Sequence, residues 1–145
     1  MTTFVFKTRN VEEAPLRVDI YDTDGETFYG AVWVKFRDNA STAYSAMLKR
    51  RYDAIPSGDK ARISKPRTEQ DRKDSAEWGV GLFVEEFVTN SEIESADGKG
   101  PLKHDPKMLV EFFMVMEFAF DKVVEQASNY GNFKKAKEEV EAKNV

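Results

Sequence analysis

The chain has 145 residues, a net charge of −4 and an apolar fraction of 41%, which suffices for one folded core and argues against global disorder. It contains no cysteine, which excludes disulfide scaffolds, zinc sites with thiolate ligands and cysteine nucleophiles. The single histidine, His104, excludes a metal site with two histidine ligands, and the acidic balance disfavours nucleic-acid binding.

The apolar runs are short. The longest uninterrupted one, residues 112–116, falls far below the roughly 20 residues that span a bilayer. The apolar stretch within the first seven residues is too short for a signal peptide. We therefore expect a cytoplasmic protein with no membrane partner.

Residues 1–37 have the pattern of β-structure. Apolar and polar residues alternate over 16–20, a turn-forming Asp-Thr-Asp-Gly follows at 22–25, and alternation resumes over 28–36. This order predicts an antiparallel β-hairpin. Because a lone hairpin is marginally stable in water, we expect a third strand from residues 3–7 or a helix packed on one face.

The period then changes to that of a helix over residues 38–55, with Asp38 or Asn39 as the N-cap and Pro56 just after the end. Residues 56–74 are polar, of mixed charge and interrupted by two prolines, which predicts a flexible charged loop. A nucleic-acid-binding arm is the alternative, but the loop has no aromatic residues between its basic ones.

Residues 75–145 read as a helical part. Helices are predicted over about 75–90, 106–127 and 133–143, with a loop over 91–105, and Asp105-Pro106 supplies an N-cap and a first helical proline. The predicted fold class is α+β. A single domain over 1–145 would join an N-terminal antiparallel β-hairpin or small sheet to a mainly α-helical bundle of about four helices.

The polar residues do not form a recognisable catalytic set. Glu85 and Glu86 are adjacent, so on a helix they point about 100° apart and cannot act as an acid–base pair. His104 lies beside a helix start, where a surface or capping role is the ordinary one. We expect no catalytic residues, no cofactor and no metal site; a small enzyme is the disfavoured alternative.

The informative residues are apolar ones on polar helix faces. Val110, Met114 and Phe118 are spaced by four within the charged side of the helix predicted over 106–127, and therefore form a ridge. Trp78 and Leu82 repeat this more weakly on the preceding helix. Two interpretations stay open: the hairpin or last helix covers the ridge, or the ridge is an exposed binding surface for another polypeptide.

The stretch from Gly79 to Phe133 resembles the tail assembly chaperones of long-tailed bacteriophages. The resemblance rests on the order of five segments, with a weaker N-terminal echo at 32–36. The five are an apolar helix with acidic residues (82–88), a loop with Asp-Gly-Lys (97–99), Pro-Leu-Lys-His-Asp-Pro (101–106), a helix starting Met-Leu-Val-Glu-Phe-Phe (108–113) and Ala-Ser-Asn-Tyr-Gly-Asn-Phe (127–133).

The resemblance implies a non-enzymatic chaperone that keeps the apolar, helical tape measure protein soluble until tail tube subunits assemble around it. It also implies a place in the host cytoplasm and absence from the mature virion. The partner-binding residues would be Val110, Met114 and Phe118, with Trp78 and Leu82, and their partner the tape measure protein or a neighbouring copy of the chain. A tail or neck structural subunit, such as a tail terminator or connector, is the alternative function.

Overall fold

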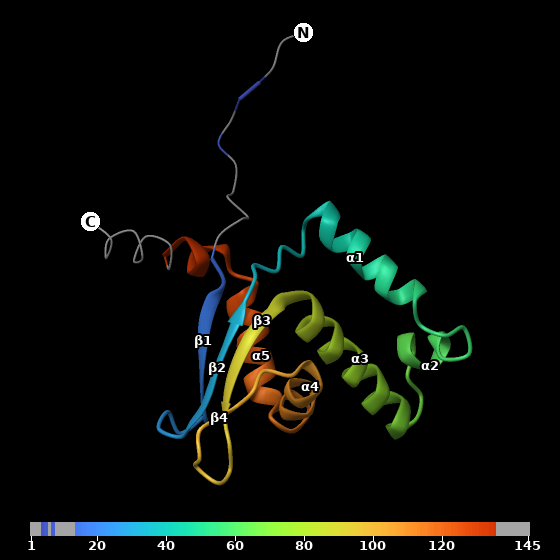
Figure 1. Cartoon of the computed structure of the whole chain (residues 1–145). Helices are drawn as coiled ribbons and strands as arrows, with labels where there is room; N and C mark the ends of the chain where they lie inside the picture. Colours follow the sequence, from blue (N-terminus) through green and yellow to red (C-terminus); the bar gives the residue numbers. More distant parts are fainter. Residues whose placement is uncertain (1–3, 6, 8–13, 136–145) are drawn as a thin grey trace.

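The computed structural model describes residues 4, 5, 7 and 14–135. They form a mixed α+β structure in which helices cover one face of a four-stranded antiparallel sheet, as the sequence predicts (Figure 1). The sheet order is β1-β2-β3-β4.

The predicted hairpin is present. It consists of β1 (Leu16–Tyr21) and β2 (Phe28–Val34), paired antiparallel with Val18 opposite Val32. The turn between them is closed by the Asp22 amide, which donates to the Thr27 carbonyl at 2.8 Å. Residues 4, 5 and 7 lie in no strand, and the rest of the strand predicted over 3–7 lies outside the described residues.

The third strand comes from elsewhere. β3 (Val88–Glu94) follows α3 (Glu69–Phe87) directly and pairs with β2, and the short β4 (Pro101–Leu102) pairs with the end of β3. The prediction of a loop over 91–105 is therefore wrong at the positions that form β3 and β4. The strand forms there because Val88, Ser91 and Ile93 are buried against the helices, while β2 offers a free edge.

The predicted loop over 56–74 is also partly helical. It contains α2 (Lys60–Ser64) and the first turn of α3. A capping box starts α3 at Thr68: the Thr68 hydroxyl accepts from the Asp71 amide, and the Asp71 carboxylate accepts from the Thr68 amide. Arg62 then joins α2 to α3 through an ion pair with Asp74 at 2.5 Å.

The helix predicted over 106–127 is divided in two. α4 (Pro106–Val115) has Asp105 as its N-cap and Pro106 at its first position, as predicted, and α5 (Glu117–Ala127) begins after a break at Met116. α4 packs on α3, whereas α5 packs against β1. The change of direction at Met116 lets one segment meet both a helix and the sheet.

Two further helices flank these elements. α1 (Thr42–Asp53) is capped by Ser41 rather than by the predicted Asp38 or Asn39. Residues 130–135 are helical, so this helix begins before the predicted residue 133, and its continuation lies outside the described residues.

The core lies between the sheet and α3, α4 and α5. The helices contribute apolar residues that are spaced by about one helical turn and therefore lie on one face of each helix. Leu109, Phe113 and Val123 are among the fully buried residues of this core. The opposite face of the sheet carries Arg17, Trp33 and Asn90 in one cross-strand row. Among the described helices, none has both the length and the apolar character needed to cross a membrane.

Candidate functional site

The five predicted partner-binding residues lie on three helices. Trp78 and Leu82 are on α3, Val110 and Met114 on α4, and Phe118 on α5. The break at Met116 separates Phe118 from the other two ridge residues. The continuous ridge predicted along one helix is therefore wrong, because its last member belongs to a differently directed helix.

Phe118 has a partner within the chain. Its ring lies 6.3 Å from that of Tyr29 on β2, measured between centroids. All three predicted ridge residues are half-buried and pack against the core, so none is fully enclosed and none is fully exposed. Leu82 is only 6% exposed. The exposed apolar surface of this region is consequently smaller than the sequence predicts.

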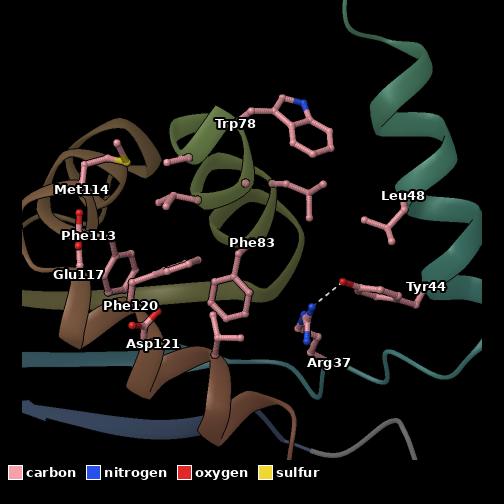
Figure 2. Close-up of a pocket in the computed structure, with 15 residues that line it drawn as sticks. Arg37, Tyr44, Leu48, Trp78, Phe83, Phe113, Met114, Glu117, Phe120 and Asp121 are labelled. Carbon is pink, nitrogen blue, oxygen red and sulfur yellow. Dashed lines mark hydrogen bonds between the residues drawn. The ribbon is translucent and has the colours of Figure 1, made fainter. Parts of the chain in front are cut away.

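A groove lies between α1 and the body of the protein, and Figure 2 shows its lining. We call it the α1 groove; its volume is about 500 Å³. Three of the five predicted residues border it, namely Trp78, Leu82 and Met114. Its other apolar lining residues are Leu48 and Tyr44 from α1, Val80 and Phe83 from α3, Phe113 from α4, and Phe120 and Val124 from α5.

The polar groups of the α1 groove differ between its two walls. Near α1, the Arg37 guanidinium donates to the Tyr44 hydroxyl at 2.6 Å and to the Ser128 hydroxyl at 3.2 Å, and it lies over the Tyr44 ring. On the α5 wall, Glu117 and Asp121 are exposed, and neither forms an ion pair within the described part of the chain.

A second groove lies on the other side of Trp78. Trp78 and Val110 border it together with Glu77 and Glu111, and we call it the α4 groove. Its volume is about 560 Å³, and its remaining lining includes Lys107 and the ion-paired side chains of Arg51 and Glu85. Trp78 therefore contributes to two adjacent hollows, and four of the five predicted residues border one or the other.

α1 is held to the body by ion pairs at its margin and by a few apolar contacts, among them the Tyr44 ring against Phe87. Arg51 pairs with Glu85 at 2.6 Å, and Arg50 pairs with Glu86 at 3.3 Å. Met47 is the one residue of this helix that is buried. Partly exposed ion pairs contribute little stability, about 1 kcal/mol or less each, and α1 buries one residue where α3 buries four, so the α1 wall of the groove is anchored less strongly than α3.

Sequence reasoning missed a third apolar surface. Val115 is 79% exposed at the end of α4, and Phe28 and Leu102 lie beside it from β2 and β4. These three residues are far apart in the sequence and meet only because β4 returns along β3. A local pattern could not have indicated this patch.

The lone histidine has a structural partner. His104 Nδ1 lies 2.6 Å from the hydroxyl of Ser91, which is 2% exposed, and the bond joins β3 to the segment before α4. Neither residue lines a groove described above. Within residues 14–135, no group of three or more His, Asp or Glu side chains is placed to hold a metal ion.

The acidic turn between β1 and β2 is satisfied by its own hydrogen bonds. The Tyr29 hydroxyl donates to Asp22, and this bond holds the pKa of the Asp22 carboxyl below its ordinary value. The backbone amide of Thr27 donates to Asp24 and lowers the pKa of that carboxyl in the same way. The carboxylates of this turn therefore stabilise the hairpin by accepting hydrogen bonds from within it.

Comparison of the chain with models of known protein families, with curated proteins and with solved structures finds no match.

Proposed function

We propose that this chain is a non-enzymatic chaperone that binds an apolar helix of a client protein, the role of a phage tail assembly chaperone toward its tape measure protein. The observation that carries the proposal is the position of Trp78, half-buried between the mainly apolar α1 groove and the more charged α4 groove. Aromatic residues in such positions are typical anchors of protein interfaces.

The grooves have a shape and chemistry suited to a helical client. An amphipathic helix is soluble only while its apolar stripe is covered, and a groove lined by Trp, Phe, Leu and Met side chains covers it. Met114 adds an unbranched, polarizable side chain, which adapts to ligands of different shape. A holdase with these properties would keep a long helical protein from aggregating.

The proposal includes the cellular setting that the resemblance implies. The chaperone would act in the host cytoplasm, hold the tape measure protein until tail tube subunits arrive, and leave before the virion is complete. Its partners would be these two proteins or a further copy of the chain.

The test is coexpression with the tape measure protein. A Trp78→Ala/Met114→Ala variant should leave that protein as insoluble as it is without the chaperone, because both grooves lose their shared aromatic wall. Val115→Ala is the matched control, since Val115 is an exposed apolar residue of α4 outside both grooves. Circular dichroism and urea unfolding verify that all variants fold; equal solubilisation by the double variant would contradict the proposal.

A stable tail or neck subunit is the second candidate. The exposed patch of Phe28, Leu102 and Val115 favours it, since such patches commonly mark permanent subunit contacts. Mass spectrometry of purified virions separates the two functions. A chaperone is absent from the particles, whereas a terminator or connector is present in a fixed copy number.

A further inference from the structure

The charges around the two grooves are unbalanced. On the α1 groove, the exposed acids Glu117 and Asp121 have no cationic partner within the described residues. The Arg37 guanidinium already donates to the Tyr44 hydroxyl of α1 and to the Ser128 hydroxyl at the end of α5. On the α4 groove, Glu77 and Glu111 are likewise unpaired in the described structure, but so is the basic Lys107, so the imbalance is clearer on the α1 groove. In the α1 groove, a mainly apolar lining therefore lies beside two acids that are free to bind a cation.

The spacing of the unpaired acids matches a helix. Glu117 and Asp121 are four residues apart in α5, so they lie about one turn apart on the same side of that helix. A neighbouring helix that packs beside α5 presents its own side chains with the same repeat, about 5.4 Å per turn. Two basic residues spaced by four on that helix can each meet one of these carboxylates.

We propose that the α1 groove binds an amphipathic helix of the client whose apolar stripe is flanked by lysine or arginine residues that pair with Glu117 and Asp121. This inference rests on the proposed function and adds the chemistry of the ligand and its orientation in the groove. The apolar stripe covers Trp78, Leu82 and Met114, and the basic flank faces α5.

The chain itself is a poorer occupant than such a client. Its net charge of −4 opposes the approach of a second acidic copy to an acidic wall. The groove charges therefore select for basic partners and against self-association, which is how charge complementarity commonly separates partners of similar apolarity.

The fluorescence of Trp78 provides a direct measurement. The other tryptophan, Trp33, lies on the open face of the sheet beneath the Arg17 guanidinium, 5.3 Å from the ring centroid. The emission of a Trp33→Phe chain therefore comes from Trp78 alone, which borders both grooves, and the Glu117 and Asp121 variants assign the binding to the α1 groove. The ligands are two synthetic helical peptides of about 18 residues, or five turns, with one leucine stripe and either lysine or glutamate beside it.

The lysine-flanked peptide should shift Trp78 emission to shorter wavelength, because it removes the indole from water. Its affinity should fall with rising ionic strength and be about tenfold lower with Glu117→Lys/Asp121→Lys. Glu117→Gln/Asp121→Asn should lower the affinity as well, by a smaller factor. This variant is also less harmful to folding, because a lysine at position 117, in the first turn of α5, would oppose the helix dipole. The glutamate-flanked peptide should bind weakly to wild type and more tightly to the charge-reversed variant.

Glu92→Lys/Glu94→Lys is the matched control. It changes the net charge equally, but both residues are exposed on β3 and neither borders the α1 groove. Its affinity for the lysine-flanked peptide should equal that of wild type. The assignment of Glu117 and Asp121 would be overturned if wild type bound the two peptides equally, or if the control lost as much affinity for the lysine-flanked peptide as the Glu117→Lys/Asp121→Lys variant does. It would also be overturned if size-exclusion chromatography showed that the chain dimerises through this groove.

The outcomes separate this inference from the proposed function. If wild type and the Glu117→Lys/Asp121→Lys variant solubilise the tape measure protein equally well, the chaperone function stands and the assignment of the two acids fails. If the lysine-flanked peptide binds as expected while the tape measure protein stays insoluble, the groove chemistry stands and the proposed client is wrong.

Discussion

At the scale of single residues, Gly30 is the position where the sheet tolerates least change. Its φ is +133°, and a Cβ built there would lie 2.2 Å from the Glu92 carbonyl oxygen of β3. Both the backbone angle and the neighbouring backbone require glycine. The sequence shows the glycine but not the strand against it, because β3 lies about 60 residues further along.

Gly30→Ala should lower the free energy of unfolding by about 3 kcal/mol, since β2 and β3 must separate to admit the methyl group. Urea unfolding followed by circular dichroism measures the change. Gly81→Ala in α3 is the control: its methyl group would meet no atom within 4 Å, and helical alanine should stabilise by about 0.5–1 kcal/mol. A Gly30→Ala chain as stable as wild type would show that β3 does not approach β2 this closely.

The sequence singles out several of the apolar residues that border the grooves, but it does not indicate how they are grouped. Trp78, Val110 and Met114 stand out in the sequence as large apolar residues among charges, and each borders a groove. Leu82 has the same pattern yet is buried, and Phe118 packs on Tyr29. Helical periodicity cannot distinguish these outcomes, because it describes one helix and not the elements that cover it.

At the scale of elements, the sequence predicts a strand or helix correctly where the pattern is local, and it fails where packing with a distant segment decides the structure. The hairpin was predictable because alternation and turn residues lie within about 20 positions. The break at Met116 was not, since neither glycine nor proline marks it and packing alone redirects the chain. β3 was missed because only Val88 and Ile93 supply its apolar side, and its partner strand precedes it by a whole helical segment.

α1 differs from the other long helices in how little of it is buried. Met47 is its one buried residue, whereas α3 buries four, Val80, Leu82, Phe83 and Val84. Elements with few buried apolar contacts open at a lower free energy than the core. α1 is therefore the wall of the groove that can move to admit a helix.

Amide hydrogen exchange should detect this opening. The Leu48 amide should be at least about tenfold less protected than that of Val84, since a difference of 1.4 kcal/mol in opening free energy gives that factor. Met47→Ala should lower protection in α1 while that of α3 stays nearly unchanged. If both helices lose protection together, α1 unfolds only with the core, and the groove wall is rigid.

At the scale of the whole molecule, the α1 groove exists because separate parts of the chain surround one space. α1 supplies one wall, α3 the floor, and α4 and α5 the other wall (Figure 2). The sheet holds these parts in place: α3 runs directly into the inner strand β3, and α5 packs on the edge strand β1. A surface assembled in this way cannot be inferred from any one segment, which is why the sequence predicts a ridge where the structure has a hollow.

The lack of cysteine makes it possible to fill this hollow in the intact protein. Leu48 projects from α1 into the groove (Figure 2), and a Leu48→Cys chain labelled with a fluorescein maleimide carries a bulky group there and nowhere else. Under the proposed function, labelling should abolish solubilisation of the tape measure protein, whereas the unlabelled Leu48→Cys chain should retain it, because the dye would fill the space of about 500 Å³ proposed for the client helix. Thr23→Cys, labelled at the exposed hairpin turn outside the groove, is the matched control and should stay active. Full activity of the labelled Leu48→Cys chain would place the client on another surface, and the patch of Phe28, Leu102 and Val115 would then be the next to examine.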